Sequence, residues 1–219
     1  MTKAAIITAA GSSSRMRGRG KKELTILKGR TVLDRAVLPF VLSEEFDHII
    51  VTYPEGKLDA VRKALHRINF PILYIQGGST RQESVFNALK ELNRIETDLV
   101  LIHDGARPYI SVDLILRVLN ETIDRGNSTP VTPSVSAMKV LNQQGDIEHH
   151  LVRSRTVSAQ TPQGFSFPEI LEAHEKALKD GSSFIDDSEV WSVYIGPAHT
   201  VPGDPGNEKI TYPRDLEEK

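Results

Sequence analysis

Short apolar runs alternate with amphipathic stretches along most of the chain. Four of these runs are rich in β-branched residues and predict strands: Ala4–Ala9, His48–Thr52, Ile72–Gln76 and Leu99–His103. Their apolar residues are continuous rather than interleaved with polar ones, which is typical of strands covered on both faces. The pattern therefore predicts a mostly parallel sheet buried between layers of helices.

The stretches between these strands carry apolar residues at helical spacing. They predict helices over Val32–Leu42, Lys57–Leu65, Arg81–Leu92 and Val112–Asp124. Pro39 lies inside the first stretch, where a proline is expected to kink the helix or to end it. Strands and helices that alternate with short connections imply right-handed crossovers, so the predicted fold class is α/β.

The alternation changes after Asp124. Met138–Leu141 and Ile147–Val152 flank a polar loop centred on Asn142–Asp146, a pattern that predicts a β-hairpin. Because an isolated two-stranded arm is only marginally stable, we expect this arm, at about 136–155, to pack on a second subunit. The remaining elements are predicted as helices at Pro168–Lys179 and Asp187–Tyr194 and strands at His199–Pro202 and Lys209–Tyr212.

Composition narrows the class of protein. The chain has 219 residues, a net charge of −2 and 39% hydrophobic residues, which is ordinary for one soluble domain spanning residues 1–219. No apolar run approaches the ~20 residues of a membrane span, and the amino terminus lacks the pattern of a secretion signal. The absence of cysteine excludes disulfides and thiolate chemistry. We therefore expect a cytoplasmic protein that binds neither membranes nor nucleic acid.

Ligands of parallel sheets bind beyond the carboxyl ends of the strands, which directs attention to three loops. The first is AAGSSSRMRGRGKK, from Ala9 to Lys22, where tiny residues are followed by five cations. Gly11 permits close approach of the backbone, and turn amides together with cations can surround an anion. Neither the P-loop nor the dinucleotide-binding glycine pattern occurs. Taken alone, this loop also fits a solvated basic surface.

The second loop is GGSTRQES, from Gly77 to Ser84. Its Thr80–Glu83 spacing is a capping box, so a helix is predicted to begin near Arg81 and to place Ser84 on its first turn. The two glycines expose backbone groups that can read the edge of a nucleotide base. The alternative is an ordinary strand-to-helix turn.

The third loop is HDGARP, from His103 to Pro108. Asp104 stands at the end of a strand, where its carboxylate can meet a ribose hydroxyl or a hydrated Mg²⁺. Arg107 can pair with that carboxylate or hold a substrate phosphate, although a purely structural Asp–Arg pair is the alternative. Elsewhere, we interpret Asp186 and Asp187 as acids of a helix amino terminus.

In order and spacing, these loops resemble one family, the 2-C-methyl-D-erythritol 4-phosphate cytidylyltransferases. Later stretches resemble its further signatures: VRSRTVSAQTPQGF over Val152–Phe165, FIDDS over Phe184–Ser188 and NEKIT over Asn207–Thr211. The likeness covers nearly the whole chain. It departs at Ala137 and Ile185, where the family typically has threonine.

The resemblance implies a Rossmann-like, mostly parallel twisted sheet with helices on both faces and a protruding β-hairpin arm that forms a homodimer. It implies an enzyme that transfers CMP from CTP to methylerythritol phosphate, an isoprenoid precursor, and releases pyrophosphate. On the nucleotide side, it implies that backbone groups of Ala9, Ala10 and Gly11 line the CTP, while Gly78 and Ser84 read the cytosine.

For the chemistry, the resemblance implies roles for residues from several segments. Asp104 and Gly105 would touch the ribose, and Arg15 with Lys22 would stabilise the transition state. The residues implied to hold the methylerythritol phosphate are Arg153, Lys209, Arg107 and Thr161. Magnesium would be held mainly by the CTP phosphates, and no protein metal ligand is expected.

Three other functions remain open at this stage. Ribitol 5-phosphate or another polyol phosphate could be the acceptor, because a cytidylyltransferase of that kind shares much of the pattern. A non-catalytic nucleotide sensor could use the same pocket. A nicotinamide-dependent oxidoreductase fits less well, because the second strand runs into Tyr53-Pro54 instead of ending in an acid that could bind ribose.

Overall fold

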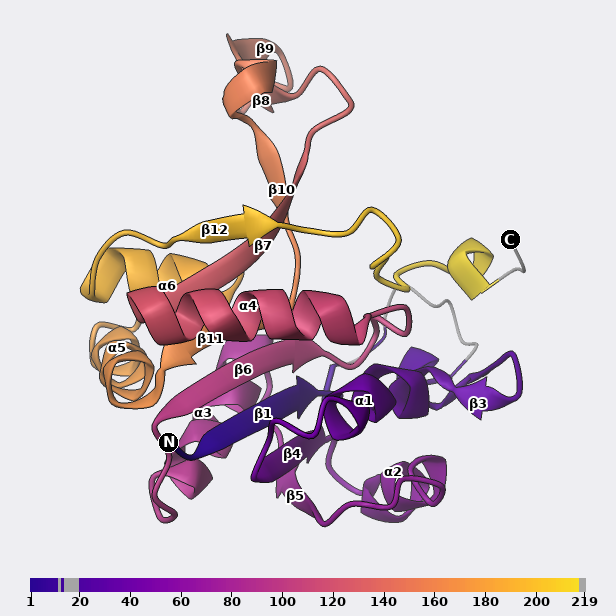
Figure 1. Cartoon of the computed structure of the whole chain (residues 1–219). Coiled ribbons are helices and arrows are strands. Elements are labelled where there is room, and N and C mark those ends of the chain that lie inside the picture. The colour runs from indigo at the N-terminus through magenta and orange to yellow at the C-terminus, as the bar shows by residue number, and fades with distance from the viewer. Residues whose placement is uncertain (12, 14–19, 217–219) are drawn as a thin grey trace.

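A twisted sheet runs through the middle of the molecule in the computed structural model, which describes residues 1–11, 13 and 20–216 (Figure 1). The strand order is β10-β7-β11-β6-β1-β4-β5, and β12 pairs with β7. The four strands expected from the sequence are β1 (Lys3–Thr8), β4 (His48–Tyr53), β5 (Ile72–Gln76) and β6 (Leu99–Asp104). They pair in parallel, which confirms the predicted half of the sheet.

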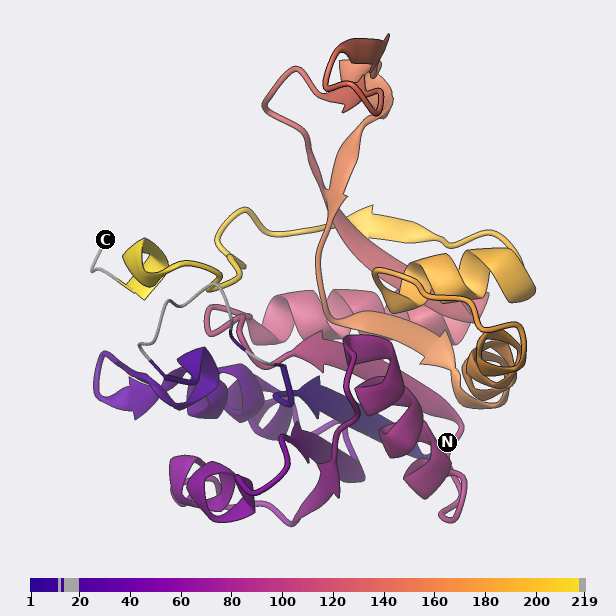
Figure 2. The ribbon, with the colours of Figure 1, turned by 180° about the vertical axis from the view of Figure 1, so that it is seen from behind.

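Helices cover both faces of this sheet (Figures 1 and 2). One face carries α1 (Val32–Leu42), α2 (Leu58–Ala64) and α4 (Val112–Arg125), and the other carries α3 (Arg81–Leu92), α5 (Phe167–Lys179) and α6 (Asp187–Tyr194). Along β1, Ala5 and Ile7 belong to the first core, while Ala4 and Ile6 belong to the second. The strand is apolar throughout because both of its faces are buried.

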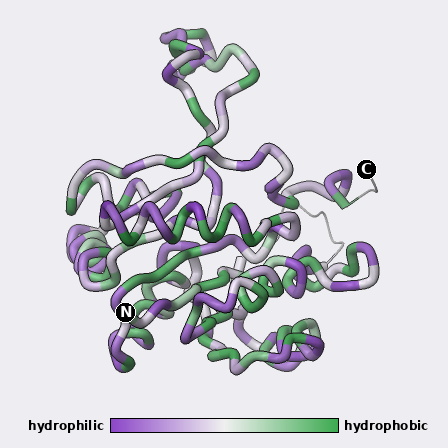
Figure 3. Tube along the Cα trace, in the orientation of Figure 1, coloured by the Kyte–Doolittle hydropathy of each residue, from purple (hydrophilic) through white to green (hydrophobic). Residues whose placement is uncertain are grey.

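The surface helices alternate in hydropathy as the sequence predicts. In Figure 3, hydrophobic and hydrophilic positions alternate along α4, whose Leu114, Ile115 and Val118 are buried in the core. Pro39 does not end α1, which continues to Leu42. Buried residues on both sides of the proline, including Val37 and Phe40, anchor this helix to the sheet, and this packing outweighs the lost backbone hydrogen bond.

The second half of the sheet is mixed, and its antiparallel strands were not expected from the sequence. It contains β7 (Asn127–Pro133), β10 (Val157–Ala159) and β11 (Gln163–Ser166), and β11 joins it to β6. The strand β12 (Thr200–Pro202) agrees with the predicted one to within a residue. The predicted strand at Lys209–Tyr212 is wrong: this segment is a loop attached by the bond from the Ile210 N–H to the carbonyl of Ala106, 2.8 Å.

An arm projects from the end of β7 and β10, away from the helices (Figures 1 and 2). It contains the hairpin β8 (Lys139–Leu141) and β9 (Ile147–His150), followed by the 3₁₀ turn η3 (Arg153–Arg155). Asn142 shapes the predicted loop, because its side-chain oxygen accepts bonds from the amides of Gln144 and Asp146. The predicted hairpin is confirmed.

A smaller unit follows the first loop and covers one end of α1. It consists of the 3₁₀ turn η2 (Lys22–Leu24) and the two-residue strands β2 (Ile26–Leu27) and β3 (Arg30–Thr31), and the last 3₁₀ turn, η4 (Pro213–Leu216), lies near it. Across the described residues, no helix has the length and apolarity that a membrane crossing requires.

Candidate functional site

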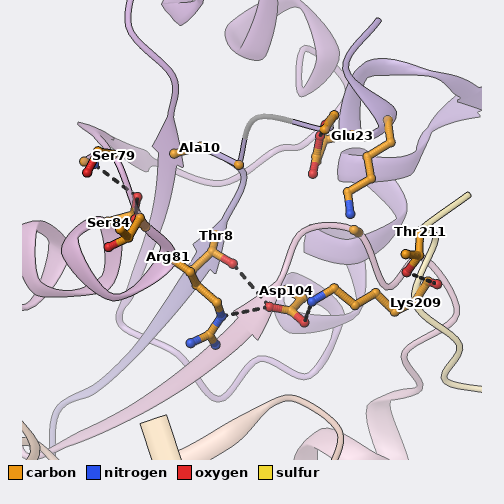
Figure 4. Close-up of a pocket in the computed structure, with 15 residues that line it drawn as sticks. Thr8, Ala10, Glu23, Ser79, Arg81, Ser84, Asp104, Lys209 and Thr211 are labelled. Atoms are coloured by element: carbon orange, nitrogen blue, oxygen red, sulfur yellow. Dashed lines mark hydrogen bonds and ion pairs between the residues drawn. The ribbon is translucent and has the colours of Figure 1, made fainter. Parts of the chain in front are cut away.

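A cavity of about 310 Å³ opens at the carboxyl edge of β1 and β6. Thr8 and Asp104 end these strands and are paired in register, so both side chains reach the same edge. The other walls come from the loop after β1 (Ala10, Gly11), η2 (Lys22, Glu23), the turn before α3 (Gly78, Ser84) and a late loop (Lys209, Thr211). Figure 4 shows side chains from these segments facing the space between them.

The described part of the loop after β1 contributes Ala10, Gly11 and Ser13 to the cavity wall. Of the three residues expected to line the CTP, Ala10 and Gly11 line the cavity, whereas the buried Ala9 does not: its amide donates to the hydroxyl of Thr52, 3.1 Å. The ammonium of Lys21 donates to the carbonyl of Gly11 and so fastens the beginning of the loop. Arg15, the predicted catalytic cation of this loop, lies outside the described residues.

The turn η2 brings one lysine and one acid to the cavity. Lys22 is only 8% exposed, and its Nζ donates to the carbonyl of Ile210, 3.0 Å. Glu23 is 4% exposed and its Oε2 accepts from the hydroxyl of Ser13, 3.1 Å. The sequence prediction identified Lys22 but missed Glu23, which lies between Lys22 and Leu24 and belongs to none of the motifs recognised in the sequence.

The turn before α3 has the predicted architecture. The hydroxyl of Thr80 caps the helix by accepting from the amide of Glu83, 3.0 Å. Ser84 accepts from the amide of Gly78 at 3.1 Å and donates to the carbonyl of Thr80 at 2.8 Å. A Cβ on Gly77 would lie 2.2 Å from that of Ala10, so the turn and the first loop meet only because this residue is glycine.

Asp104 is the centre of charge in the cavity. One carboxylate oxygen lies 2.7 Å from Nζ of Lys209, and the other lies 3.2 Å from Nε of Arg81. Nε of Arg107 lies 3.6 Å away. Burial acts to raise the pKa of this carboxyl, but the three cations outweigh it and hold the pKa well below its usual value. Figure 4 shows Arg81 and Lys209 reaching the carboxylate from opposite sides.

Arg81 is a site residue that the sequence reasoning treated only as the start of a helix. Its Nη1 lies 2.7 Å from Oδ2 of Asp187, whose other oxygen lies 3.2 Å from Nε2 of the buried His174. Asp187 is therefore a member of a buried ion network rather than only a helix-terminal acid. Asp186 does cap α6, accepting from the amide of Glu189 at 3.0 Å, as predicted. No signal in the sequence linked these segments.

Two of the predicted contacts lie behind the cavity instead of lining it. Thr161 is buried and its hydroxyl accepts from the amide of Asp104, 3.1 Å, and bonds Nδ1 of His103, 3.0 Å. It therefore positions Asp104. Gly105 is also absent from the cavity wall, and a Cβ there would approach the carbonyl of Thr8 to 2.9 Å.

Burial, above all, lowers the pKa of His103 to about 3, so this ring is neutral.

Arg107 and Arg153 stand apart from the main cavity in this chain. Arg107 donates from Nη1 to the carbonyl of Asn207, 2.7 Å, and lines a neighbouring open depression together with Lys209. Arg153 lies in η3 on the arm and does not line the cavity. The described residues therefore bring together Lys22, Lys209 and Asp104 but leave Arg153 without a role in its own chain.

The arrangement suits a strongly anionic ligand. Lys22 and Lys209 face one cavity together with Arg81 at the start of α3, and fixed positive charges of this kind stabilise phosphate groups. Among the described residues, no three or more histidine or acidic side chains are grouped to hold a metal ion.

Comparison with known proteins places the chain beside enzymes of one kind. Residues 3–218 match the family model described as "2-C-methyl-D-erythritol 4-phosphate cytidylyltransferase". A protein of that name from Clostridium beijerinckii is 34% identical, and the match covers 97% of this chain and 94% of that protein. The crystal structure of 4-diphosphocytidyl-2C-methyl-D-erythritol synthase from Anaerococcus prevotii superimposes with a TM-score of 0.86 at 29% identity, covering 98% of this chain and 94% of that one.

Other relatives are longer. The bifunctional enzyme IspD/IspF of Rhodopseudomonas palustris strain BisB5 is 38% identical over 97% of this chain but only 54% of its own length. The chain thus spans about half the length of the bifunctional relatives that it matches.

Proposed function

Because the chain belongs to the 2-C-methyl-D-erythritol 4-phosphate cytidylyltransferase family, we propose that it transfers CMP from CTP to 2-C-methyl-D-erythritol 4-phosphate. An oxygen of the acceptor phosphate attacks the α-phosphorus of CTP. The new P–O bond forms as the bond between the α-phosphorus and the bridging oxygen breaks, and pyrophosphate leaves with that electron pair. The product is 4-diphosphocytidyl-2-C-methyl-D-erythritol.

One observation carries this proposal. Lys22 and Lys209 come from opposite ends of the chain, and both line the same cavity as Asp104. Both reactants are anions, so the barrier consists largely of their repulsion and of charge that grows on the leaving pyrophosphate. Fixed cations lower that barrier by positioning and by electrostatic stabilisation, without a nucleophilic side chain.

The nucleotide occupies the side of the cavity formed by Ala10, Gly11 and the turn before α3. The N–H of Gly78 donates to Oγ of Ser84, 3.1 Å, and this bond fixes the backbone of the turn beside which the cytosine edge would lie. Asp104 ends β6 at the same edge of the sheet and is placed to accept from a ribose hydroxyl. Lys22 reaches the phosphates from η2.

The acceptor phosphate occupies the side formed by Lys209. The ammonium of Lys209 is held 2.7 Å from Asp104 and can turn its remaining hydrogens toward a phosphate oxygen. Arg107 lines the depression beside Lys209 and extends the positive region in that direction.

Magnesium would be held mainly by phosphate oxygens of CTP, where it would neutralise charge on the triphosphate. Of the two carboxylates that line the cavity, Asp104 is already engaged by Lys209 and Arg81, and Glu23 accepts a hydrogen bond from Ser13.

A second copy of the chain would complete the site. The arm exposes apolar side chains that a partner would cover, with exposed fractions of 84% for Val135, 57% for Leu141 and 59% for Val152. Arg153 follows the hairpin directly, so an arm that reaches across a dimer carries this guanidinium to the partner's cavity. In this way Arg153, predicted from the sequence together with Arg15, Lys22 and Lys209, would contact the acceptor phosphate.

The direct test is pyrophosphate release on mixing the protein with CTP, Mg²⁺ and methylerythritol phosphate. Ribitol 5-phosphate as acceptor, and ATP, GTP and UTP as donors, form the comparison panel, because Ala137 and the 87% exposed Ile185 depart from the family pattern. We expect release only with CTP and methylerythritol phosphate. Release with ribitol 5-phosphate instead would reassign the acceptor, and CTP binding without turnover would identify a sensor.

A further inference from the structure

Glu23 is an acidic residue in a cavity otherwise suited to anions. Its side chain belongs to η2, is 4% exposed and lines the cavity beside Lys22. In Figure 4 its carboxylate points from η2 toward the space between Ala10 and Asp104. The phosphates of a bound nucleotide would therefore share this space with a carboxylate.

Among the described residues, the charge of Glu23 is compensated only in part, by the nearby charges of Lys22 and Lys21. Among the residues that the structure describes, no lysine or arginine forms an ion pair with it, and its side-chain bond comes from the neutral hydroxyl of Ser13. Burial raises the pKa of Glu23, although its backbone hydrogen bond and the neighbouring charge of Lys22 oppose this change. A buried, unpaired carboxylate responds strongly to any further negative charge placed near it.

We propose that Glu23 is a specificity-determining residue that makes the cavity reject metal-free triphosphate in favour of the Mg²⁺ complex. This inference rests on the proposed function, because it concerns how the same cavity binds CTP. Metal-free CTP carries more negative charge than its Mg²⁺ complex and is repelled more strongly by the carboxylate. Lys22 alone would attract both forms, so the adjacent acid supplies the discrimination.

The contact with Ser13 fixes where the carboxylate lies. Ser13 belongs to the loop that follows Gly11 and has φ +53°, a conformation that non-glycine residues adopt at a cost. Its hydrogen bond to Glu23 joins this loop to η2. Glu23→Gln removes the charge but keeps an oxygen that can accept from Ser13, whereas Glu23→Asp keeps the charge and shortens the side chain.

Isothermal titration calorimetry of CTP binding, with MgCl₂ or with EDTA at matched ionic strength, tests the inference. We expect Glu23→Gln to bind metal-free CTP about tenfold more tightly than the wild type does. The affinities of the variant and the wild type for the Mg²⁺ complex should differ by less than about threefold. Glu23→Asp should retain the discrimination of the wild type. Glu175→Gln makes the same change of net charge on the exposed side of α5 and should change neither affinity.

Two results would overturn the inference, and they differ from failure of the proposed function. If Glu23→Gln keeps the wild-type ratio of the two affinities, or if Glu23→Asp loses it, charge at this position does not discriminate. If the wild type binds CTP in neither form, the proposed function fails and the inference falls with it. Thermal unfolding followed by circular dichroism establishes that each variant is folded.

Discussion

The ammonium nitrogen of Lys209 lies 2.7 Å from Oδ2 of Asp104, which joins a late loop to the end of the interior strand β6. Arg81 holds the other oxygen of the same carboxylate at 3.2 Å. Asp104 therefore holds the ammonium of Lys209 at one side of the cavity, while its own orientation depends on Arg81 in the first turn of α3. The two halves of the cavity are electrostatically coupled through this one carboxylate.

Removing Lys22 should impair chemistry more than folding. We expect Lys22→Ala to lower turnover by roughly 10²–10³, about 3–4 kcal/mol, because a fixed charge that stabilises the transition state is lost. Steady-state pyrophosphate release at saturating CTP measures the effect. Lys179→Ala is the matched control, since Lys179 is an exposed lysine at the end of α5 that does not line the cavity, and its loss of turnover should be much smaller. Near-normal turnover of Lys22→Ala would contradict the assignment.

Gly77→Ala should damage both stability and nucleotide binding. The new methyl group would lie 2.2 Å from Cβ of Ala10 and 2.7 Å from Oγ of Ser84, so one cavity wall must move. Overpacking of this kind costs about 1–3 kcal/mol. Urea unfolding and calorimetric CTP binding report the two effects. Gly145→Ala, in the arm loop, provides a comparison that leaves CTP affinity unchanged, and equal CTP affinity for Gly77→Ala would refute the prediction.

Asp187→Asn should destabilise the fold although Asp187 does not line the cavity. It removes the charge that faces Arg81 at 2.7 Å, and breaking a buried pair by neutralising one partner costs about 3–5 kcal/mol. Equilibrium unfolding in urea measures the loss. Glu175→Gln, an exposed position of α5, is the control and should stay within about 0.5 kcal/mol of the wild type. A loss below about 1 kcal/mol would show that the network contributes little.

Mixing two inactive variants tests whether Arg153 acts across a dimer. In a heterodimer of Arg153→Ala and Lys22→Ala, one site carries both substitutions and the other carries neither. Random exchange of subunits should therefore restore about a quarter of the wild-type activity. If Arg153 serves the cavity of its own chain, the mixture stays inactive. Gel filtration of the wild type and of each variant tests whether they form the dimer that this experiment requires.

We expect the free energy of unfolding to depend on pH through the buried ring of His103. Burial lowers its folded pKa to about 3, so the unfolded chain binds a proton below its ordinary pKa of 6.5 while the folded chain does not. Stability from this group is therefore complete above pH 6.5 and decreases as the pH falls toward 3, by about 1.4 kcal/mol per unit. Urea unfolding between pH 5 and 7 measures the slope above the range in which the unfolded chain protonates Asp104 and Asp187, whose folded pKa values are lowered.

His103→Asn isolates this contribution, because the amide can still bond the hydroxyl of Thr161. Its unfolding free energy should vary less with pH over the same range. His66→Asn, on an exposed ring, should leave the slope as it is in the wild type. Equal slopes for His103→Asn and the wild type would contradict the prediction.

The sequence by itself determined the local features of the fold and of the cavity. Strands such as β1 and β6 were recognisable because burial on both faces demands continuous apolar residues, and α3 because Thr80 and Glu83 form a cap. Ser84 followed from the same helix geometry. Each of these inferences depends on residues only a few positions apart, where backbone geometry decides which groups meet.

Only the tertiary structure decided the rest. The antiparallel strands β7 and β11 depend on pairing with distant partners, and the loop at Lys209 depends on its bond to Ala106 rather than on β propensity. The network of Arg81, Asp104 and Asp187 joins three segments that share no local pattern. Charges meet across such distances because packing of the sheet and helices brings them together, and a linear pattern carries no record of which surfaces will pack.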